Sequence, residues 1–242
     1  MGTPVKPYKG REESKKEQVR EMFDQIAPSY DLLNRMLSLG IDVLWRKKAI
    51  RMLKPLKPQV IADIATGTGD FAVEAMALNP KQVIAIDISS EMISIGREKV
   101  AKKGLDRQIE FRIGDSEGLD LPTGSIDAVT VGFGVRNFEN LPKGLAEICR
   151  VLRPGGVAVI LEPAFPTKFP LGPLFQFYFK VIAPRIGKMV SGDDAAYTYL
   201  PESVAAFPHG EDFLTICKNA GFTRTRFRPL TGGICALYWL EK

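Results

Sequence analysis

The sequence predicts an α/β fold: a seven-stranded, mostly parallel sheet with helices on both faces. Short apolar segments alternate with stretches of helical periodicity between residues 60 and 161. A glycine-rich turn, residues 65–70, directly follows the first of these apolar segments. Parallel strands need a crossover connection, usually a helix, so this regular alternation is typical of a parallel sheet that is covered on both sides.

Two helices are expected before the first strand. A helical pattern over 14–26 begins at Ser14, a suitable N-cap, and should end before Pro28. A second helix should cover about 42–53. Residues 1–13 are polar and of mixed charge, which predicts a flexible tail.

The central elements follow one another in a regular order. We expect strands at 60–64, 82–87, 109–113, 126–131 and 156–161, with helices at 70–78, 90–103 and 141–152 between them. The pattern breaks at residues 165–208, where phenylalanines and prolines crowd together, and we expect an insertion that caps the ligand-binding edge of the sheet. A last helix at 211–220 and two strands at 222–227 and 233–240 complete the sheet.

Composition limits the class of protein. The 242 residues, 45% of them hydrophobic, suit one domain with a substantial core, which we place at residues 14–242. No run of about 18 apolar residues occurs, so a transmembrane helix is not expected. The three cysteines are scattered and His209 is the only histidine, which argues against a disulfide framework, a metal centre or a histidine-based triad. These features predict a cytoplasmic protein without a metal cofactor.

Charged residues around the glycine-rich turn indicate the kind of cofactor. Gly67 and Gly69 let the backbone come close to a ligand. Asp87 ends the second strand, where it can accept hydrogen bonds from both hydroxyls of a ribose. A turn and an acid of this kind serve NAD equally well, but Asp63 and Asp70 flank the turn and would repel a pyrophosphate. They would attract a cation, and S-adenosylmethionine carries both an ammonium and a sulfonium.

Two further segments fit the same cofactor. Asp115 ends the third strand and can accept from an adenine amino group, while the backbone amide of Ser116 can donate to a ring nitrogen. A Pro-Gly-Gly turn, 154–156, precedes the fifth strand, and Ile88 beside Asp87 belongs to the predicted pocket. This ordered set predicts binding of S-adenosylmethionine, and a NAD-dependent reductase is the less favoured alternative.

The ordered set is similar to class I methyltransferases, and several segments resemble one family among them more closely. Residues 23–46 and 133–138, with the C-terminal segments 197–203, 220–222 and 230–233, resemble the quinone C-methyltransferases. These enzymes methylate a ring carbon of demethylmenaquinol or of a ubiquinone precursor. The resemblance implies a Rossmann-like class I methyltransferase fold with S-adenosylmethionine as the methyl donor.

The resemblance also implies roles for individual residues. The donor contacts that it implies are Thr68, Asp87, Asp115 and Ser116. Gly132 is included in the pocket because some members of the family have a serine at this position. Residues 162–166 depart from the Glu-Phe-Ser or Glu-Phe-Thr that the family usually shows. The resemblance therefore does not extend to the wall of the site beside the fifth strand.

These observations predict C-methylation of demethylmenaquinol to menaquinol in menaquinone biosynthesis. The alternatives are C-methylation of a ubiquinone-precursor benzoquinol and methylation of another small molecule, because the donor half of the site is generic. We favour the naphthoquinol because the sequence shows no transit peptide and looks like a bacterial cytosolic protein.

The candidate catalytic residues follow the fourth strand. We expect Arg136 to stabilise the phenolate, directly or through a water that takes the proton, and Asn137 to orient the ring. The alternatives for Arg136 are the capping of a loop and an ion pair with Glu139 or Glu162. The remaining candidates are ring-side or proton-relay residues, for which core packing is the alternative: Tyr30 and Tyr199.

A polyprenylated quinol needs an apolar channel. The aromatic-rich stretch 165–182 should supply one wall and the helix from Ser14 the other. The nearly all-round apolar character of 174–182 predicts either peripheral contact at the inner face of the membrane or burial in a cap or homodimer interface. Nucleic acid is not an expected partner, because the chain has no dense basic stripe and residues 132–137 lack the Asn/Asp-Pro-Pro-Tyr or Pro-Cys motif of many nucleic-acid methyltransferases.

Overall fold

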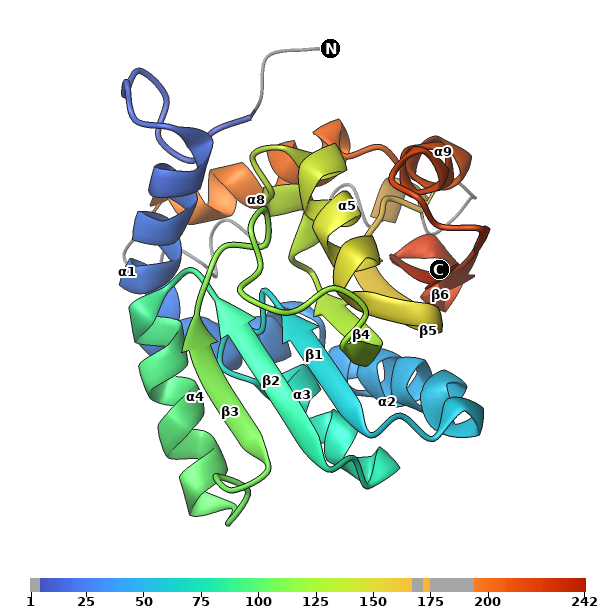
Figure 1. Cartoon of the computed structure of the whole chain (residues 1–242). Helices are drawn as coiled ribbons and strands as arrows, with labels where there is room; N and C mark the ends of the chain where they lie inside the picture. The colour runs from blue at the N-terminus through green and yellow to red at the C-terminus, as the bar shows by residue number, and fades with distance from the viewer. Residues whose placement is uncertain (1–4, 167–171, 175–193) are drawn as a thin grey trace.

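The computed structural model describes residues 5–166, 172–174 and 194–242. Within these residues, seven strands form one sheet in the order β3-β2-β1-β4-β5-β7-β6 (Figure 1). The neighbours from β3 to β5 pair in parallel, and β7 is antiparallel to both β5 and β6. The strands are β1 Val60–Ile64, β2 Gln82–Asp87, β3 Ile109–Ile113, β4 Ile126–Gly132, β5 Leu152–Pro163, β6 Arg224–Leu230 and β7 Cys235–Glu241. The predicted α/β class with a mostly parallel, seven-stranded sheet is confirmed.

The order of the strands reverses between β1 and β4, and this reversal fixes the place of a ligand. From β1 the chain moves outward to β2 and β3, and it then returns to β4 on the other side of β1. In open α/β sheets a crevice forms at such a reversal, outside the carboxyl ends of the two strands. The loops after β1 and β4 therefore border a common space.

Helices cover both faces of the sheet. They are α1 Lys15–Leu37, α2 Ile41–Leu53, α3 Asp70–Ala75, α4 Ser90–Lys102, α5 Leu141–Val151, α8 Asp194–Ala206 and α9 Glu211–Asn219. On one face α5 and α9 bury Ile148 and Phe213, and on the other α2, α3 and α4 bury Trp45, Phe71 and Val100. The central strands are thus covered on both sides, which explains why their sequences are almost continuously apolar.

The first helix is longer than predicted. Ser14 caps α1 as expected, but the helix runs from Lys15–Leu37 through Pro28, the residue that should have ended it. A proline removes one backbone hydrogen bond from a helix. The buried face nevertheless continues on both sides of it, with Ile26 and Leu33 in the same apolar cluster. Tertiary packing therefore outweighs the local break.

Two residues of the predicted flexible tail contact the helices. The backbone N–H of Tyr8 donates to Gln18 Oε1 at 2.9 Å, and Lys9 pairs with Glu202 on α8 at 2.7 Å. Residues 9–13 are otherwise exposed, and the flexibility of the tail stays a prediction.

The remaining elements agree with the prediction to within a few residues, apart from the start of β5. The Pro-Gly-Gly turn lies inside β5 as an irregularity, because Leu152 already pairs with Ile126 before Val157 pairs with Ala128. Of the predicted capping insertion, 165–208, the structure describes α8 and a few residues around it. Most of the aromatic stretch 165–182 lies outside the described residues.

Neither a membrane-spanning helix nor a metal-binding cluster is found in the described part of the chain. No helix there has the length and apolar character needed to cross a bilayer. No group of three or more His, Cys, Asp or Glu side chains there is arranged to hold a metal ion. The three cysteines, Cys149, Cys217 and Cys235, are buried as free thiols.

Phe111 on β3 is held between two glycines. A Cβ at Gly69 would lie 2.6 Å from the ring Cζ, and a Cβ at Gly96 on α4 would lie 2.5 Å from Cε1. We expect Gly96→Ala to lower the free energy of unfolding by about 1–3 kcal/mol, because the ring has no room to move toward Gly69. Urea denaturation measures this change. Ser94→Ala, at an exposed position of the same helix, is the control and should not destabilise; equal stability of Gly96→Ala and the wild type would contradict the prediction.

Candidate active site

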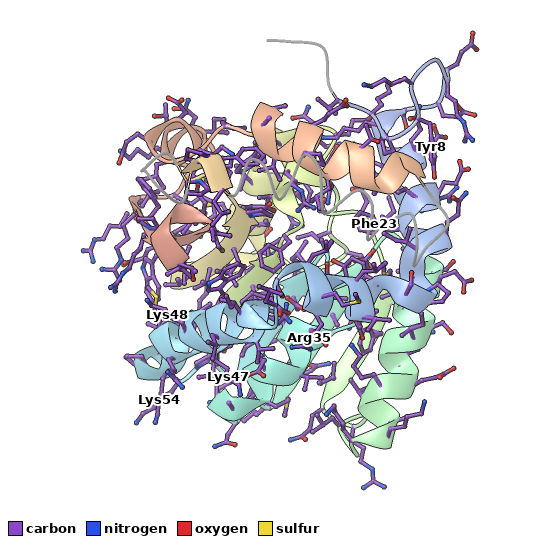
Figure 2. The ribbon with its side chains drawn as sticks, turned by 180° about the vertical axis from the view of Figure 1, so that it is seen from behind. Tyr8, Phe23, Arg35, Lys47, Lys48 and Lys54 are labelled. Carbon is purple, nitrogen blue, oxygen red and sulfur yellow. The ribbon has the colours of Figure 1, made fainter. Side chains whose placement is uncertain are left out.

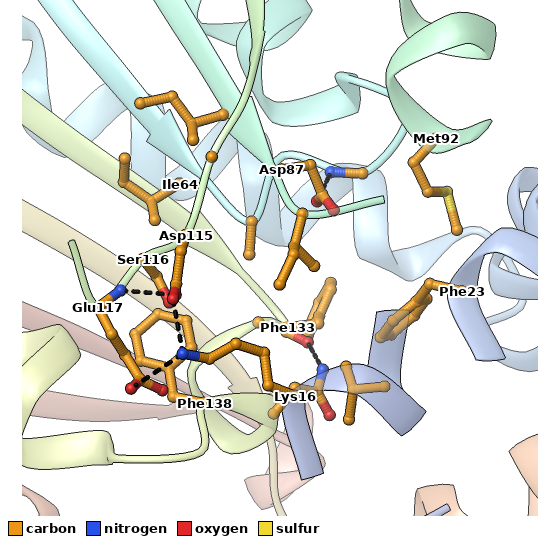
Figure 3. A pocket seen from close by; sticks show the side chains of 18 of the residues that line it. Lys16, Phe23, Ile64, Asp87, Met92, Asp115, Ser116, Glu117, Phe133 and Phe138 are labelled. Carbon is orange, nitrogen blue, oxygen red and sulfur yellow. Dashed lines mark hydrogen bonds and ion pairs between the residues drawn. The ribbon is translucent and has the colours of Figure 1, made fainter. Parts of the chain in front are cut away.

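A cavity opens at the carboxyl edge of the sheet, where the strand order reverses (Figure 3). One wall comes from α1, and the other walls come from the loops after β1, β2, β3 and β4. The predicted site residues that line the cavity are Tyr30, Gly67, Asp87, Ile88, Asp115, Ser116, Gly132 and Asn137. Those that lie off its wall are Asp63, Thr68, Gly69, Arg136 and Tyr199.

The loop after β1 brings backbone, not side chains, to the cavity. Gly67 and Gly69 have positive φ angles of 56° and 82°, a conformation that glycine adopts without strain. Gly67 lines the cavity, and its N–H donates to Asp87 Oδ2 at 2.7 Å. A Cβ at Gly69 would meet Phe111, so packing requires a glycine here, and its place in the donor pocket stays a prediction.

Asp87, at the end of β2, is placed to hold the ribose of a nucleotide. Its buried carboxylate accepts from the N–H of Gly67 at 2.7 Å and from the N–H of Ser89 at 2.9 Å. These two bonds use different oxygens, and each oxygen keeps a further lone pair. Ile88 lines the cavity beside it. The two hydroxyls of a ribose can therefore each donate to one oxygen of Asp87.

Asp70 does not have the role that its place beside the loop predicts. Its carboxylate pairs with Lys99 at 2.8 Å and with Arg46 at 3.0 Å. Burial acts to raise the pKa of Asp70, but Lys99 and Arg46 outweigh burial and lower it. Because the protein itself neutralises this carboxylate, Asp70 adds little negative charge to the cavity.

Asp63 and Asp87 leave negative charge uncompensated. Asp63 is fully buried beneath the loop, where it accepts from the hydroxyls of Thr66 at 2.5 Å and Thr130 at 2.6 Å. Burial raises the pKa of Asp63 to about 6, and burial also raises the pKa of Asp87. No ion pair joins either one to a cation within the described residues. A cationic ligand would offset this cost, so the cavity fits a sulfonium donor better than a pyrophosphate.

Donor affinity is expected to rise between about pH 5 and pH 7. The raised pKa means that the unliganded fold favours protonated Asp63, so its contribution to stability is present at low pH and is lost as the pH rises through about 6. A cationic ligand favours the ionised form instead, and binding should be roughly five-fold tighter at the higher pH. Calorimetric titration with S-adenosylmethionine measures this. Asp63→Asn should weaken the pH dependence, and an affinity that falls with pH would contradict the prediction.

Thr68 joins the loop to two helices. Its hydroxyl donates to Asp31 Oδ1 at 2.5 Å and accepts from Lys99 Nζ at 2.8 Å. Asp31 belongs to α1 and Lys99 to α4. The contact of Thr68 with the donor, which the resemblance implies, stays a prediction.

The end of the cavity at β3 has the two predicted residues and one that sequence analysis misses. Lys16 of α1 donates through Nζ to Asp115 Oδ2 at 2.6 Å and to Glu117 Oε2 at 3.4 Å (Figure 3). Asp115 Oδ1 accepts from the N–H of Glu117 at 2.9 Å, and Ser116 lines the cavity beside it. Each carboxylate oxygen keeps one lone pair, so an adenine amino group can share Asp115 with Lys16.

The wall from α1 could be found in the sequence only as an amphipathic stripe. Lys16, Val19, Phe23 and Tyr30 line the cavity at spacings of three, four and seven residues, which places them on one helix face. Phe23 and Tyr30 meet edge to face with their ring centroids 5.9 Å apart. Burial raises the pKa of Tyr30, which keeps its hydroxyl protonated. A stripe of this kind is more often part of a core, and therefore the sequence alone does not mark it as a site.

Arg136 and Asn137 lie in a short 3-10 turn, Val135–Asn137, after β4. Asn137 lines the cavity, and the hydroxyl of Tyr199 on α8 donates to its Oδ1 at 3.1 Å. Arg136 lies behind it and pairs with Glu162 at 3.2 Å, with side chains that are 8% and 0% exposed. The ion pair between Arg136 and Glu162, which sequence analysis gives as the alternative, therefore forms in the structure.

One N–H donor of the Arg136 guanidinium has no hydrogen-bond partner in the described part of the chain. Its Nε is buried without a hydrogen-bond partner among the residues that the structure describes. The turn itself is held from α1, because Lys15 Nζ donates to the backbone carbonyls of Arg136 and Phe138, both at 2.9 Å. Burial lowers the pKa of Lys15 to about 8. Sequence analysis misses this contact, which joins the first turn of α1 to the candidate catalytic turn.

Known proteins resemble the chain over nearly its full length. The model of the "ubiE/COQ5 methyltransferase family" matches residues 11–242. The demethylmenaquinone methyltransferase of Bacteroides fragilis is 51% identical over 98% of this chain and 97% of that protein. The protein of the same name from Deinococcus radiodurans is 45% identical over the whole of both chains. A ubiquinone/menaquinone biosynthesis C-methyltransferase UbiE from Geotalea uraniireducens is 41% identical over 94% of this chain and 97% of that protein.

Solved structures support the fold. A SAM-dependent methyltransferase from Thermotoga maritima has a TM-score of 0.63 at 19% identity and covers 92% of this chain and 99% of its own. One from Aquifex aeolicus has a TM-score of 0.56 at 21% identity and covers 76% of this chain and 81% of its own. The class I methyltransferase fold, the enzyme class and S-adenosylmethionine as donor are thus confirmed predictions. The chain belongs to the ubiE/COQ5 methyltransferase family.

Proposed function

We propose that the protein transfers a methyl group from S-adenosylmethionine to a ring carbon of demethylmenaquinol and forms menaquinol in menaquinone biosynthesis. Relatives named for this reaction are 43–51% identical over nearly the whole chain, which supports the proposal. One observation carries it: a single cavity is lined both by the uncompensated carboxylate of Asp87 and by the amide of Asn137, which lies beside Arg136. The first suits a cationic donor and the second suits the oxygen of a quinol.

The donor half of the site positions a reactive group. Asp87 holds the ribose, Asp115 the adenine, and the backbone at Gly67 allows close approach. Bound S-adenosylmethionine supplies a methyl group that is electrophilic because its sulfur is cationic. Gly132 brings a wall without a side chain to the cavity, since a Cβ there would already lie 3.0 Å from Phe71 Cδ1. Because the donor is already reactive, positioning and exclusion of water supply much of the rate enhancement.

The acceptor half of the site stabilises the developing phenolate. Loss of a phenolic proton raises the electron density on the neighbouring ring carbon, which then attacks the methyl group. Arg136 lies behind Asn137 and off the cavity wall, so its positive charge stabilises the phenolate oxygen from there, directly or through a water that takes the proton. Oδ1 of Asn137 accepts from Tyr199 and Nδ2 donates to the carbonyl of Phe133 at 3.5 Å, so the second N–H of the amide is left to orient the ring. A second proton then leaves the methylated carbon and restores aromaticity.

The two tyrosines have different parts in this proposal. Burial raises the pKa of Tyr199 to about 12, so its hydroxyl stays protonated and positions Asn137 without relaying a proton. Tyr30 lines the cavity and contacts the acceptor ring from the side of α1.

Membrane contact and location belong to the same proposal. The polyprenyl tail of the quinol leads from the cavity toward the bilayer, and the protein works as a peripheral protein at the inner face of the membrane. The stretch 165–182, from which this contact is predicted, lies largely outside the described residues, and a homodimer interface is its alternative. Co-sedimentation with anionic vesicles tests the contact, and an absence of binding would count against it.

A donor-dependent assay with reduced demethylmenaquinone and its benzoquinone counterpart, side by side, tests the reaction. Faster methylation of the naphthoquinol supports the proposal. Faster methylation of the benzoquinol would select the ubiquinone precursor, to which the name of the Geotalea relative also points. Protein that binds the donor but methylates neither quinol would contradict both.

A further inference from the structure

The turn between α1 and α2 exposes a group of large apolar side chains. Leu39 in this turn is 80% exposed, and Leu32 and Met36 on α1 and Leu44 on α2 are exposed as well. Single exposed leucines are common on soluble proteins and need no explanation. Four large apolar side chains exposed around one turn are less usual, and such a group indicates an interaction surface.

Leu39 also has an unfavourable backbone conformation. Its φ angle is +51°, in the left-handed region that residues other than glycine, asparagine and aspartate rarely adopt. The turn thus presents a leucine at its tip where a polar residue would be more stable in water. Both features indicate that the side chain of Leu39 is needed for contact with something apolar.

The outward face of α2 next to this turn is basic. Residues 43–62 contain six Lys or Arg and no Asp or Glu. Lys47, Lys48, Arg51 and Lys54 follow Leu44 at spacings of three and four residues, so they share one helix face. Figure 2 shows Lys47 and Lys48 on α2 and Lys54 directly after it, with Arg35 near the end of α1. We use the name hairpin patch for four cations and four apolar residues: Lys47, Lys48, Arg51 and Lys54, with Leu32, Met36, Leu39 and Leu44.

We propose that the hairpin patch docks the protein on an anionic lipid bilayer. The apolar side chains insert at the interface, and the four cations lie against the headgroups, as in interfacial helices with a basic face. A second copy of this chain fits the patch less well, because a symmetric contact would bring the same cations together. The inference rests on the proposed function for its purpose, since a polyprenylated quinol resides in the bilayer.

Co-sedimentation of the full-length protein with vesicles, without donor or quinol, tests the charges. We expect binding to phosphatidylcholine vesicles that contain phosphatidylglycerol and none to phosphatidylcholine alone. The triple variant Lys47→Gln/Arg51→Gln/Lys54→Gln should bind roughly 100-fold more weakly, at about five-fold for each charge. The matched control Lys102→Gln/Lys103→Gln/Arg107→Gln removes three exposed cations from the end of α4 and should bind nearly as the wild type does.

Leu39→Asn tests the apolar part. Asparagine adopts the left-handed region more readily than leucine, so this variant should resist urea at least as well as the wild type. Its binding to anionic vesicles should still fall roughly ten-fold, because the inserted side chain is lost. Unchanged vesicle binding would show that Leu39 does not enter the membrane and would overturn its part in the patch.

Three other results would overturn the docking surface. They are an equal loss of binding in both triple variants, no binding of the wild type to anionic vesicles, and light scattering that shows Leu39→Asn converting a dimer into monomers. All variants should methylate a short-tailed quinol at the wild-type rate without vesicles. Because vesicle binding is measured without donor or quinol, a failure of the proposed reaction and a failure of docking give different results.

Discussion

Replacing Arg136 with alanine should lower kcat by roughly 10²- to 10³-fold and leave the dissociation constant of S-adenosylmethionine close to that of the wild type. Arg136 lies in the turn after β4, beside Asn137, whereas Asp87, the residue proposed to hold the donor, lies at the end of β2. Its loss therefore removes charge stabilisation of the acceptor without touching the donor. Turnover and calorimetric titration on the same preparation measure the two effects. Near-normal turnover with normal donor binding would contradict the proposed role.

The ion pair with Glu162 makes a second variant necessary. Burial raises the pKa of Glu162, and Arg136 opposes this shift. Removing Arg136 alone leaves a buried carboxylate without its cation, which is expected to destabilise the fold by about 3–5 kcal/mol. The double variant Arg136→Gln/Glu162→Gln removes both charges and should regain most of the stability but not the turnover. Recovery of turnover in the double variant would assign Arg136 a structural role only.

The local sequence pattern predicts the strands of the sheet more accurately than it predicts the structure of the N-terminal region. β1, β2 and β3 are short, apolar and bounded by turn residues, and their bounds are those that the sequence predicts. Pro28 is a local break as well, yet α1 continues through it because the buried face on both sides packs on the same neighbours. Packing of this kind depends on residues far away in the chain, so periodicity in one segment does not reveal it.

The residues of the candidate site also fall into those that the sequence could place and those that it could not. Asp87 and Asp115 could be placed from the sequence, because the carboxyl ends of parallel strands meet at one edge of a sheet. The orientation of Thr68 could not, because its partners Asp31 and Lys99 lie 37 and 31 residues away. Lys16 was missed for the same reason, since its contact with Asp115 spans 99 residues. Backbone topology was thus predictable, whereas the direction of a loop side chain depended on which distant charges it meets.

Replacing Asp87 with asparagine should weaken the binding of S-adenosylmethionine by roughly 100-fold or more. The carboxylate accepts from the N–H groups of Gly67 and Ser89 while it faces the cavity. An amide presents an NH₂ group in place of one oxygen, so a donor then faces either a backbone N–H or a ribose hydroxyl. The substitution also removes a negative charge from the cavity. Calorimetric titration of the variant measures the combined loss.

Two comparisons separate these causes. Asp70→Asn removes a carboxylate beside the same loop, but Asp70 is already paired with Lys99 and Arg46, so donor affinity should stay close to that of the wild type. S-adenosylhomocysteine keeps the ribose and lacks the sulfonium charge. If Asp87 acts mainly on the ribose, Asp87→Asn weakens both ligands equally; if it acts mainly by charge, the donor loses more. An equal loss in Asp70→Asn would mean that the net charge of the loop, and not the position of Asp87, controls donor binding.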